Sequence, residues 1–249
     1  MPEQPYKRPP ITEAVIGIRF ADPIDSATLD KVASAIKPLY PREDILKGVQ
    51  FQMRLDATLP TAPQSIEQIG YRLSSPDQTH ILILMPTPPS LTMSQLAPYP
   101  GWDQFFGRFC RDWSVWKKSV GYIKITRVGV RYINRIDIPM VDPIVYEEEF
   151  LNVYPHIPEV LGPMMQYSVQ TQSYISDIEC VLTLNSSVVP SPLIGHRSFV
   201  IDLDIGKDSP PQNDTDLYDL INRIRVAKNR VFEACITNRA RELFEPWLE

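Results

Sequence analysis

Cysteine and histidine are scarce in this chain, and their scarcity excludes several kinds of site. Among 249 residues there are 3 cysteines and 3 histidines. The cysteines are far apart and form no CxxC pair, so a disulfide framework and the familiar zinc spacings are excluded. The histidines fall in different predicted elements without a ligand-like neighbour. We therefore expect no metal and no cofactor, and a reducing compartment.

Long apolar runs and glycine-rich loops are also missing. The longest apolar run, Ile81 to Met85, is far too short to span a membrane. The N-terminus has no apolar signal segment, so we expect a cytoplasmic protein without a membrane partner. Only 10 residues are glycine, and GxGxxG, GxxxxGK[ST], HExxH and GxSxG are all absent. The sequence therefore names no reaction and no catalytic residue.

Proline, by contrast, is abundant, with 25 residues. The prolines cluster between the periodic segments, where they indicate stiff connections in an ordered protein. Apolar residues make up 43% of the chain, which is a globular composition. The net charge is -5, whereas proteins that grip duplex nucleic acid are usually basic. Net charge thus disfavours nucleic acid as the partner without excluding a local basic patch.

Alternating apolar residues predict strands in the first half, interrupted by two helical patterns. The strands are expected around 15–20, 49–56, 69–73, 80–85 and 91–96. One helix is expected to follow an N-cap at Ser26, and a second runs from Pro100-Gly101 to Gly121. The aromatic residues of the second helix, between Trp102 and Trp116, recur at the spacing of core packing.

The second half follows a similar plan. Its strands are expected around 122–138, 164–174, 178–184 and 199–205. A short helix is predicted over 145–154, and Asn213 is expected to cap a final helix with acids in its first turns. The segment Gly17-Ile18-Arg19-Phe20 matches Gly129-Val130-Arg131-Tyr132, and Asp-Pro-Ile and Tyr-Pro follow in both halves.

Three matches in one order predict an internal duplication. We expect an α+β fold of two β-α-β-β-β-β-α repeats, residues 1–121 and 122–249, packed together as one compact unit. Their strands would form a curved antiparallel sheet with the helices on one face.

This element order resembles a duplicated TATA-box-binding-protein fold, a resemblance of shape only. The segments Tyr6–Val15, Arg127–Ile136 and Phe232–Thr237 resemble a sporadically distributed, uncharacterised prokaryotic family of about this length. Its members are scattered among bacteria as mobile or defence genes are, and a place in toxin–antitoxin modules has been suggested for some. The resemblance brings no catalytic motif.

Arginines recur on the polar phase of the predicted strands. Guanidinium groups bind phosphate and carboxylate bidentately, so this face is a candidate anion- or partner-binding surface. The candidate residues are Arg19, Arg54, Arg127, Arg131 and Arg135. The alternative is that they pair across strands with acids on a solvated sheet. The acids in question are Glu13, Glu179, Asp202 and Asp204.

Three functions follow. The first is a non-enzymatic binding protein that uses the polar sheet face or the basic last helix to hold a protein partner, or that forms a homodimer, within a toxin–antitoxin or defence module. The second is an RNA- or nucleotide-directed enzyme or toxin that holds phosphate with Arg19, Arg127 and Arg131. The third, DNA binding by a saddle-shaped sheet, is disfavoured by the net charge.

Overall fold

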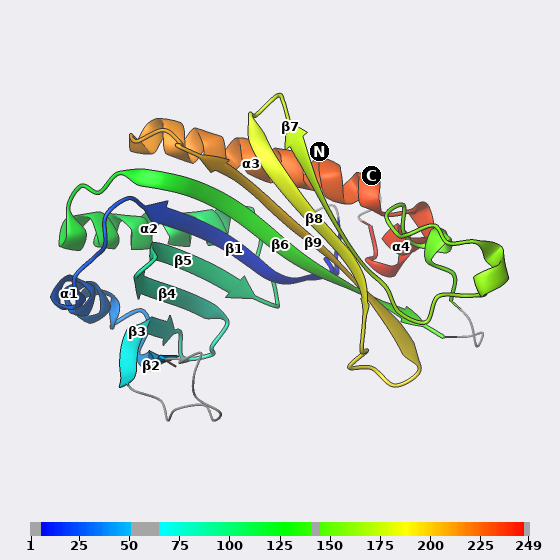
Figure 1. The fold of residues 1–249 in the computed structure, drawn as a ribbon, viewed down its shortest axis with the longest axis horizontal. Helices are drawn as coiled ribbons and strands as arrows, with labels where there is room; N and C mark the ends of the chain where they lie inside the picture. The colour runs from blue at the N-terminus through cyan, green and yellow to red at the C-terminus, as the bar shows by residue number, and fades with distance from the viewer. Residues whose placement is uncertain (1–5, 51–64, 141–144, 247–249) are drawn as a thin grey trace, which may run out of the picture.

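One open antiparallel sheet of nine strands organises the chain, of which the computed structural model describes residues 6–50, 65–140 and 145–246 (Figure 1). In chain order the strands are β1 (Ile11–Phe20), β2 (Arg42–Gln50), β3 (Ser65–Ser74), β4 (His80–Pro86), β5 (Pro89–Leu96), β6 (Ile125–Pro139), β7 (Ser168–Ile175), β8 (Cys180–Val189) and β9 (His196–Asp208). Their order across the sheet is β2-β3-β4-β5-β1-β6-β9-β8-β7. The α-helices are α1 (Ser26–Ile36), α2 (Trp102–Val120), α3 (Asp214–Cys235) and α4 (Asn238–Leu243). The expected α+β class with an antiparallel sheet is confirmed.

β1 and β6 lie at the centre of the sheet and show how its two faces differ. They pair antiparallel, with Gly17 opposite Gly129 and Arg19 opposite Arg127. Ile18 and Val128, the pair between these two, are buried. Because side chains alternate along a strand, one face is apolar and covered, and the other is polar and open.

The helices α1, α2 and α3 cover the apolar face. Phe20 of β1 stacks on Trp116 of α2 with ring centroids 4.9 Å apart. The Lys228 ammonium of α3 lies 3.8 Å from the centroid of the Tyr132 ring of β6. Buried side chains of α1 and of both halves of the chain belong to the same core. Helix burial therefore holds the two halves of the sheet on one continuous apolar layer.

Helix ends follow local chemistry, with one correction. α1 is capped by Asp25, whose carboxylate accepts from the Thr28 backbone N–H at 2.8 Å, and not by Ser26. Asn213 caps α3 as predicted, accepting from the Asp216 N–H at 2.9 Å. α2 ends at Gly121, whose φ of 81° suits glycine.

The second half departs from the predicted β-α-β-β-β-β-α order. Its described residues form four strands, and the helix expected over 145–154 is only a 3₁₀ turn, η1 (Glu147–Glu149). The backbone beyond this turn pairs with the chain that leaves α3: the Asn152 N–H donates to Cys235 O, and the Thr237 N–H donates to Phe150 O. These long-range bonds satisfy backbone groups that a helix would have used internally.

The strand expected over 49–56 can be compared with the structure only in part. It lies mostly outside the described residues, and β2 ends at Gln50. The three cysteines are free. In the described part of the chain, no helix has the length and apolar character that crossing a membrane requires.

Candidate functional site

The predicted arginines meet on the open face of the sheet. Arg19 on β1 and Arg127 on β6 are cross-strand partners, and Arg131 and Arg135 follow on the same face of β6. Arg54 lies outside the described residues. The structure thus brings four of the five candidates onto two neighbouring strands.

Three of these four arginines already pair with acids. Arg131 makes a bidentate pair with Asp202 on β9, with Nε–Oδ1 at 2.8 Å and Nη2–Oδ2 at 2.7 Å. Two further pairs are Arg127 with Asp208, at 3.4 Å, and Arg135 with Asp137, at 3.0 Å. Cross-strand pairing, the alternative raised from the sequence, is therefore what Arg131 and Arg127 do.

Glycine at position 206 lets Arg127 lie flat on the sheet. A Cβ built on Gly206 would come within 2.5 Å of Arg127 Nη2. Any larger residue would push the guanidinium away from Asp204 and Asp208, whose nearest contacts to it are 3.7 and 3.4 Å. The arrangement holds this arginine among acids rather than leaving it open to a ligand.

The cations of the last helices are paired in the same manner. Their ion pairs are Arg223–Asp219, Arg230–Asp177, Arg239–Glu149 and Arg241–Glu233. Asp219 and Glu233 lie on α3, Asp177 lies in the turn between β7 and β8, and Glu149 lies in η1. The basic C-terminal segment is therefore largely neutralised within the fold, and it is a weaker candidate surface than its sequence indicates.

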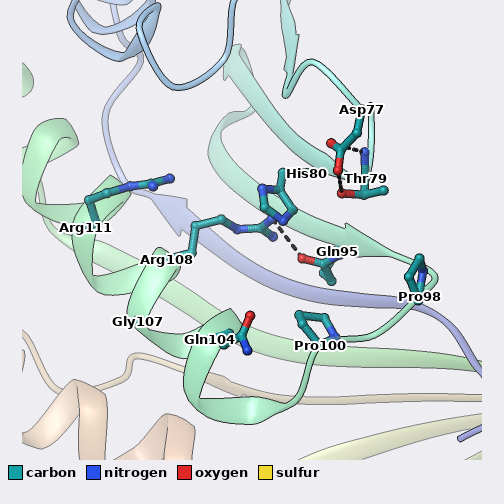
Figure 2. A pocket seen from close by; sticks show the side chains of 10 residues that line it. All are labelled: Asp77, Thr79, His80, Gln95, Pro98, Pro100, Gln104, Gly107, Arg108 and Arg111. Atoms are coloured by element: carbon teal, nitrogen blue, oxygen red, sulfur yellow. Dashed lines mark hydrogen bonds between the residues drawn. The ribbon is translucent and has the colours of Figure 1, made fainter.

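A pocket of about 560 Å³ opens between α2, the start of β4 and the end of β5 (Figure 2). Its size is in the range of small-molecule sites. Its lining combines two arginines, a histidine, two glutamines and two prolines with small residues. These residues are Asp77, Thr79, His80, Gln95, Pro98, Pro100, Gln104, Gly107, Arg108 and Arg111.

Arg108 is the buried cation of this pocket, with 7% of its surface exposed. Its Nη1 donates to Gln95 Oε1 at 3.1 Å, and its Nη2 donates to the Ser94 carbonyl at 2.7 Å. Its Nε is buried without a hydrogen-bond partner among the described residues. Across that part of the chain, Arg108 makes no ion pair with a carboxylate.

The acid nearest in the helix, Asp112, is committed elsewhere. It is buried, pairs with Arg111 at 2.8 Å and accepts a hydrogen bond from the Tyr40 hydroxyl. Burial raises the pKa of Asp112 above the ordinary aspartate value, although Tyr40 and Arg111 oppose the rise. Asp77, exposed at the rim, uses its carboxylate on the Thr79 hydroxyl at 2.9 Å. Neither acid forms an ion pair with Arg108, whose hydrogen bonds go to neutral acceptors, and both acids attract its charge only from a greater distance.

His80 lies beside Arg108 on the pocket wall (Figure 2). Burial, and next the positive charge of Arg108, lower the pKa of His80 below its ordinary value. The imidazole is therefore neutral at pH 7 and offers one N–H donor and one acceptor. No cluster of metal-ligating side chains occurs in the described ranges. The arrangement can bind and orient an anion.

The sequence contained a signal for this pocket that the aromatic pattern obscured. Arg108 and Asp112 lie at helical spacing within the stripe formed by Phe105, Phe109 and Trp116, all of them buried. Charged residues on the apolar stripe of a helix are costly unless paired or used. Core packing of the aromatic residues is confirmed, but the two charges among them mark the site.

Replacing Gly107 with alanine is expected to raise the free energy of unfolding by about 0.5–1 kcal/mol, because glycine inside a helix is entropically costly. A Cβ at this position would meet no atom within 4 Å. Gly121→Ala is the matched control, because its φ of 81° strains an L side chain and should lower the stability. Urea unfolding of the two variants measures both signs, and a destabilised Gly107→Ala would contradict the open space above Gly107.

Exposed apolar side chains form a second candidate surface at the end of the sheet away from α1, where the turn before β7 and the β8–β9 hairpin both lie (Figure 1). We call this the distal patch: Met140, Val160, Leu161, Met165, Leu193 and Ile194. Ile194 and Val160 are 101% and 90% exposed. Two hydrogen bonds hold the segments together: the Met140 backbone N–H donates to Gly195 O at 2.8 Å, and Arg197 Nη2 donates to Met164 O at 2.6 Å.

Comparison with known proteins adds no identity to this geometry. No family model matches the chain, and no curated protein matches its sequence.

Proposed function

We propose that the chain is a non-enzymatic binding protein that holds a protein partner at the distal patch. The observation that carries this proposal is the grouping of six exposed apolar side chains on three segments, which hydrogen bonds from Met140 to Gly195 and from Arg197 to Met164 bring together. Contiguous apolar surface on a folded protein marks interaction sites, because its exposure to water is unfavourable. A protein with an apolar surface of its own is the occupant that this patch fits.

The edge strand β7 is a second feature that indicates a contact region at this end of the molecule. It pairs only with β8 among the described strands, and its sequence, SVQTQSYI, contains no charged residue and no proline. Protected edges usually carry such residues, which discourage pairing with another chain. A second copy of this chain is the competing occupant, in which case the protein is a homodimer.

The other hypotheses receive less support. An RNA- or nucleotide-directed toxin that uses the sheet arginines would need free guanidinium groups, whereas Arg127 and Arg131 contact acids. A DNA-binding saddle would place Asp204 and Asp208 against phosphates. The resemblance to the sporadic prokaryotic family supports a cytoplasmic toxin–antitoxin or defence module as the setting of the partner.

We also infer that the two halves arose by duplication of one TATA-box-binding-protein-like unit. β1 and β6 meet with Gly17 opposite Gly129, and β5 and β9 flank them on either side. Among its described residues, the second half has no counterpart of α1 and one strand fewer than the first. This proposal keeps the boundary between residues 121 and 122.

Ile194→Asp is expected to abolish co-purification of a stoichiometric protein partner from the native host, because it places a charge on the most exposed side chain of the distal patch. Tyr122→Asp is the matched control: Tyr122 is 78% exposed but precedes β6, whereas Met140 follows it. A partner that both variants retain would contradict the patch. A wild-type chain that is monomeric and free of partners would contradict the proposal. Self-association measured by sedimentation would mean that a second copy of the chain occupies the patch.

A further inference from the structure

We propose that the pocket beneath α2 binds the phosphate group of a small molecule, with Arg108 as the anchoring residue. This goes beyond partner binding at the distal patch, which lies toward the other end of the sheet. The pocket holds a buried guanidinium, a second guanidinium on Arg111, and amides on Gln95 and Gln104.

Arg108 is a buried cation that forms no ion pair with an acid in the described part of the chain. A buried charge is costly unless a counter-ion and hydrogen bonds compensate it. Arg108 is 7% exposed, the acceptors of its two hydrogen bonds are neutral oxygens of Gln95 and Ser94, and its Nε has no acceptor in the described part of the chain. An oxyanion in the adjoining space would supply a directly paired negative charge, because guanidinium and phosphate match in geometry.

The pocket is open above Gly107, the residue next to Arg108 in α2. Gly107 precedes Arg108 within α2 and also lines the pocket, and nothing lies within 4 Å of a Cβ built there. Glycine in a helix interior is unfavourable, and no neighbouring atom requires it. Gly107 is exposed, so the space above it is the open mouth of the pocket, through which a ligand can reach the buried arginine.

The charges and the volume of the pocket indicate the class of ligand. Arg108 and Arg111 present two guanidinium groups on one side of the pocket, while Asp112 forms its ion pair with Arg111 and attracts the charge of Arg108 only from a greater distance. Phosphate accepts more hydrogen bonds than a carboxylate and can carry two charges. A volume of about 560 Å³ leaves room for more than phosphate, so a small organic phosphate fits better than the free ion. Pro98 and Pro100 provide an apolar wall for the organic part.

The test is calorimetric titration of the full chain with inorganic phosphate and with AMP, with acetate at matched ionic strength as the carboxylate comparison. We expect saturable binding of both phosphates, tighter for AMP. Arg108→Gln should weaken it by about ten-fold or more, since a charged hydrogen bond contributes about 1.5–3 kcal/mol. Gly107→Leu, which fills the space with a good helix former, should block AMP.

The control is Arg19→Ala, which removes an exposed arginine of the open sheet face and should leave binding unchanged. If Arg108→Gln does not fold, Gly107→Leu decides the outcome alone. Absence of saturable phosphate or AMP binding to the wild type would overturn the proposal. So would undiminished binding by Gly107→Leu, loss of binding in Arg19→Ala, or acetate binding as tight as that of phosphate.

Discussion

Arg131→Ala is expected to lower the free energy of unfolding by about 2–3 kcal/mol, because it leaves the carboxylate of Asp202 without its guanidinium partner. The Asp202 side chain is 9% exposed and is held by both arms of Arg131. After the substitution it would keep only the Asn185 amide, at 3.2 Å. The Arg131 side chain is 47% exposed, so water entering its place limits the loss to the lower part of the range for buried pairs.

Arg19→Ala provides the control for that experiment. Arg19 is exposed on the same face and makes no ion pair within the described residues, so its loss should change stability by less than about 0.5 kcal/mol. The double variant Arg131→Ala with Asp202→Ala should show a coupling energy of about 1–3 kcal/mol in a double-mutant cycle. Equal and small effects of Arg131→Ala and Arg19→Ala in urea unfolding would mean that Arg131 is free for an anion.

Lys228→Met is expected to stabilise the protein, raising the free energy of unfolding at pH 7 by about 2–4 kcal/mol. Lys228 is 7% exposed beneath β6, and burial, followed by the charge of Arg225, lowers its pKa to about 7. Methionine keeps the unbranched shape without the buried charge. The contact of the ammonium with the Tyr132 ring recovers part of the cost, which places the effect toward the lower end of the range.

The pH dependence distinguishes this explanation from better packing alone. Because the folded pKa of Lys228 lies below its unfolded value, the unfolded chain binds more protons above pH 7, so stability rises with pH. Between about pH 7 and 8.5 the wild type should gain about 1–2 kcal/mol, a gain that Lys228→Met should lose. Higher pH is unsuitable, because burial raises the pKa of Cys235 to about 11, and above the ordinary thiol pKa this group makes stability fall with pH and opposes the effect of Lys228. Lys118→Met, at an exposed position, should keep the wild-type slope, and a slope that survives in Lys228→Met would contradict the buried charge.

Much of the fold was readable from alternation, because half-buried antiparallel strands place every second residue in the core. The strand after Tyr122 and the cap at Asn213 are examples in which local pattern and tertiary environment agree. The helix expected over 145–154 was wrong because its backbone pairs with residues near Cys235 instead. Such long-range bonds leave no trace in a local pattern.

The candidate site was less predictable, for a related reason. The polar phase of the strands identified Arg131 and both nearby acids, but only the register of β6 and β9 shows that Asp204 lies opposite and that Asp202, one step away along the face, accepts the bidentate pair. The pocket depends on Arg108 approaching His80 and Gln95 from another element. Its sequence signal, a charge within an aromatic stripe, indicates an unusual position without indicating what it contacts.

We propose that anions bind beneath α2 and not on the arginine-bearing sheet face. Anomalous diffraction from a crystal soaked in tungstate, a heavy tetrahedral analogue of phosphate, tests this most directly. We expect a peak within hydrogen-bonding distance of the Arg108 guanidinium, bordered by His80 and Gln104, and no peak beside Arg131. A peak between Arg19 and Arg127, with the pocket beneath α2 unoccupied, would contradict it.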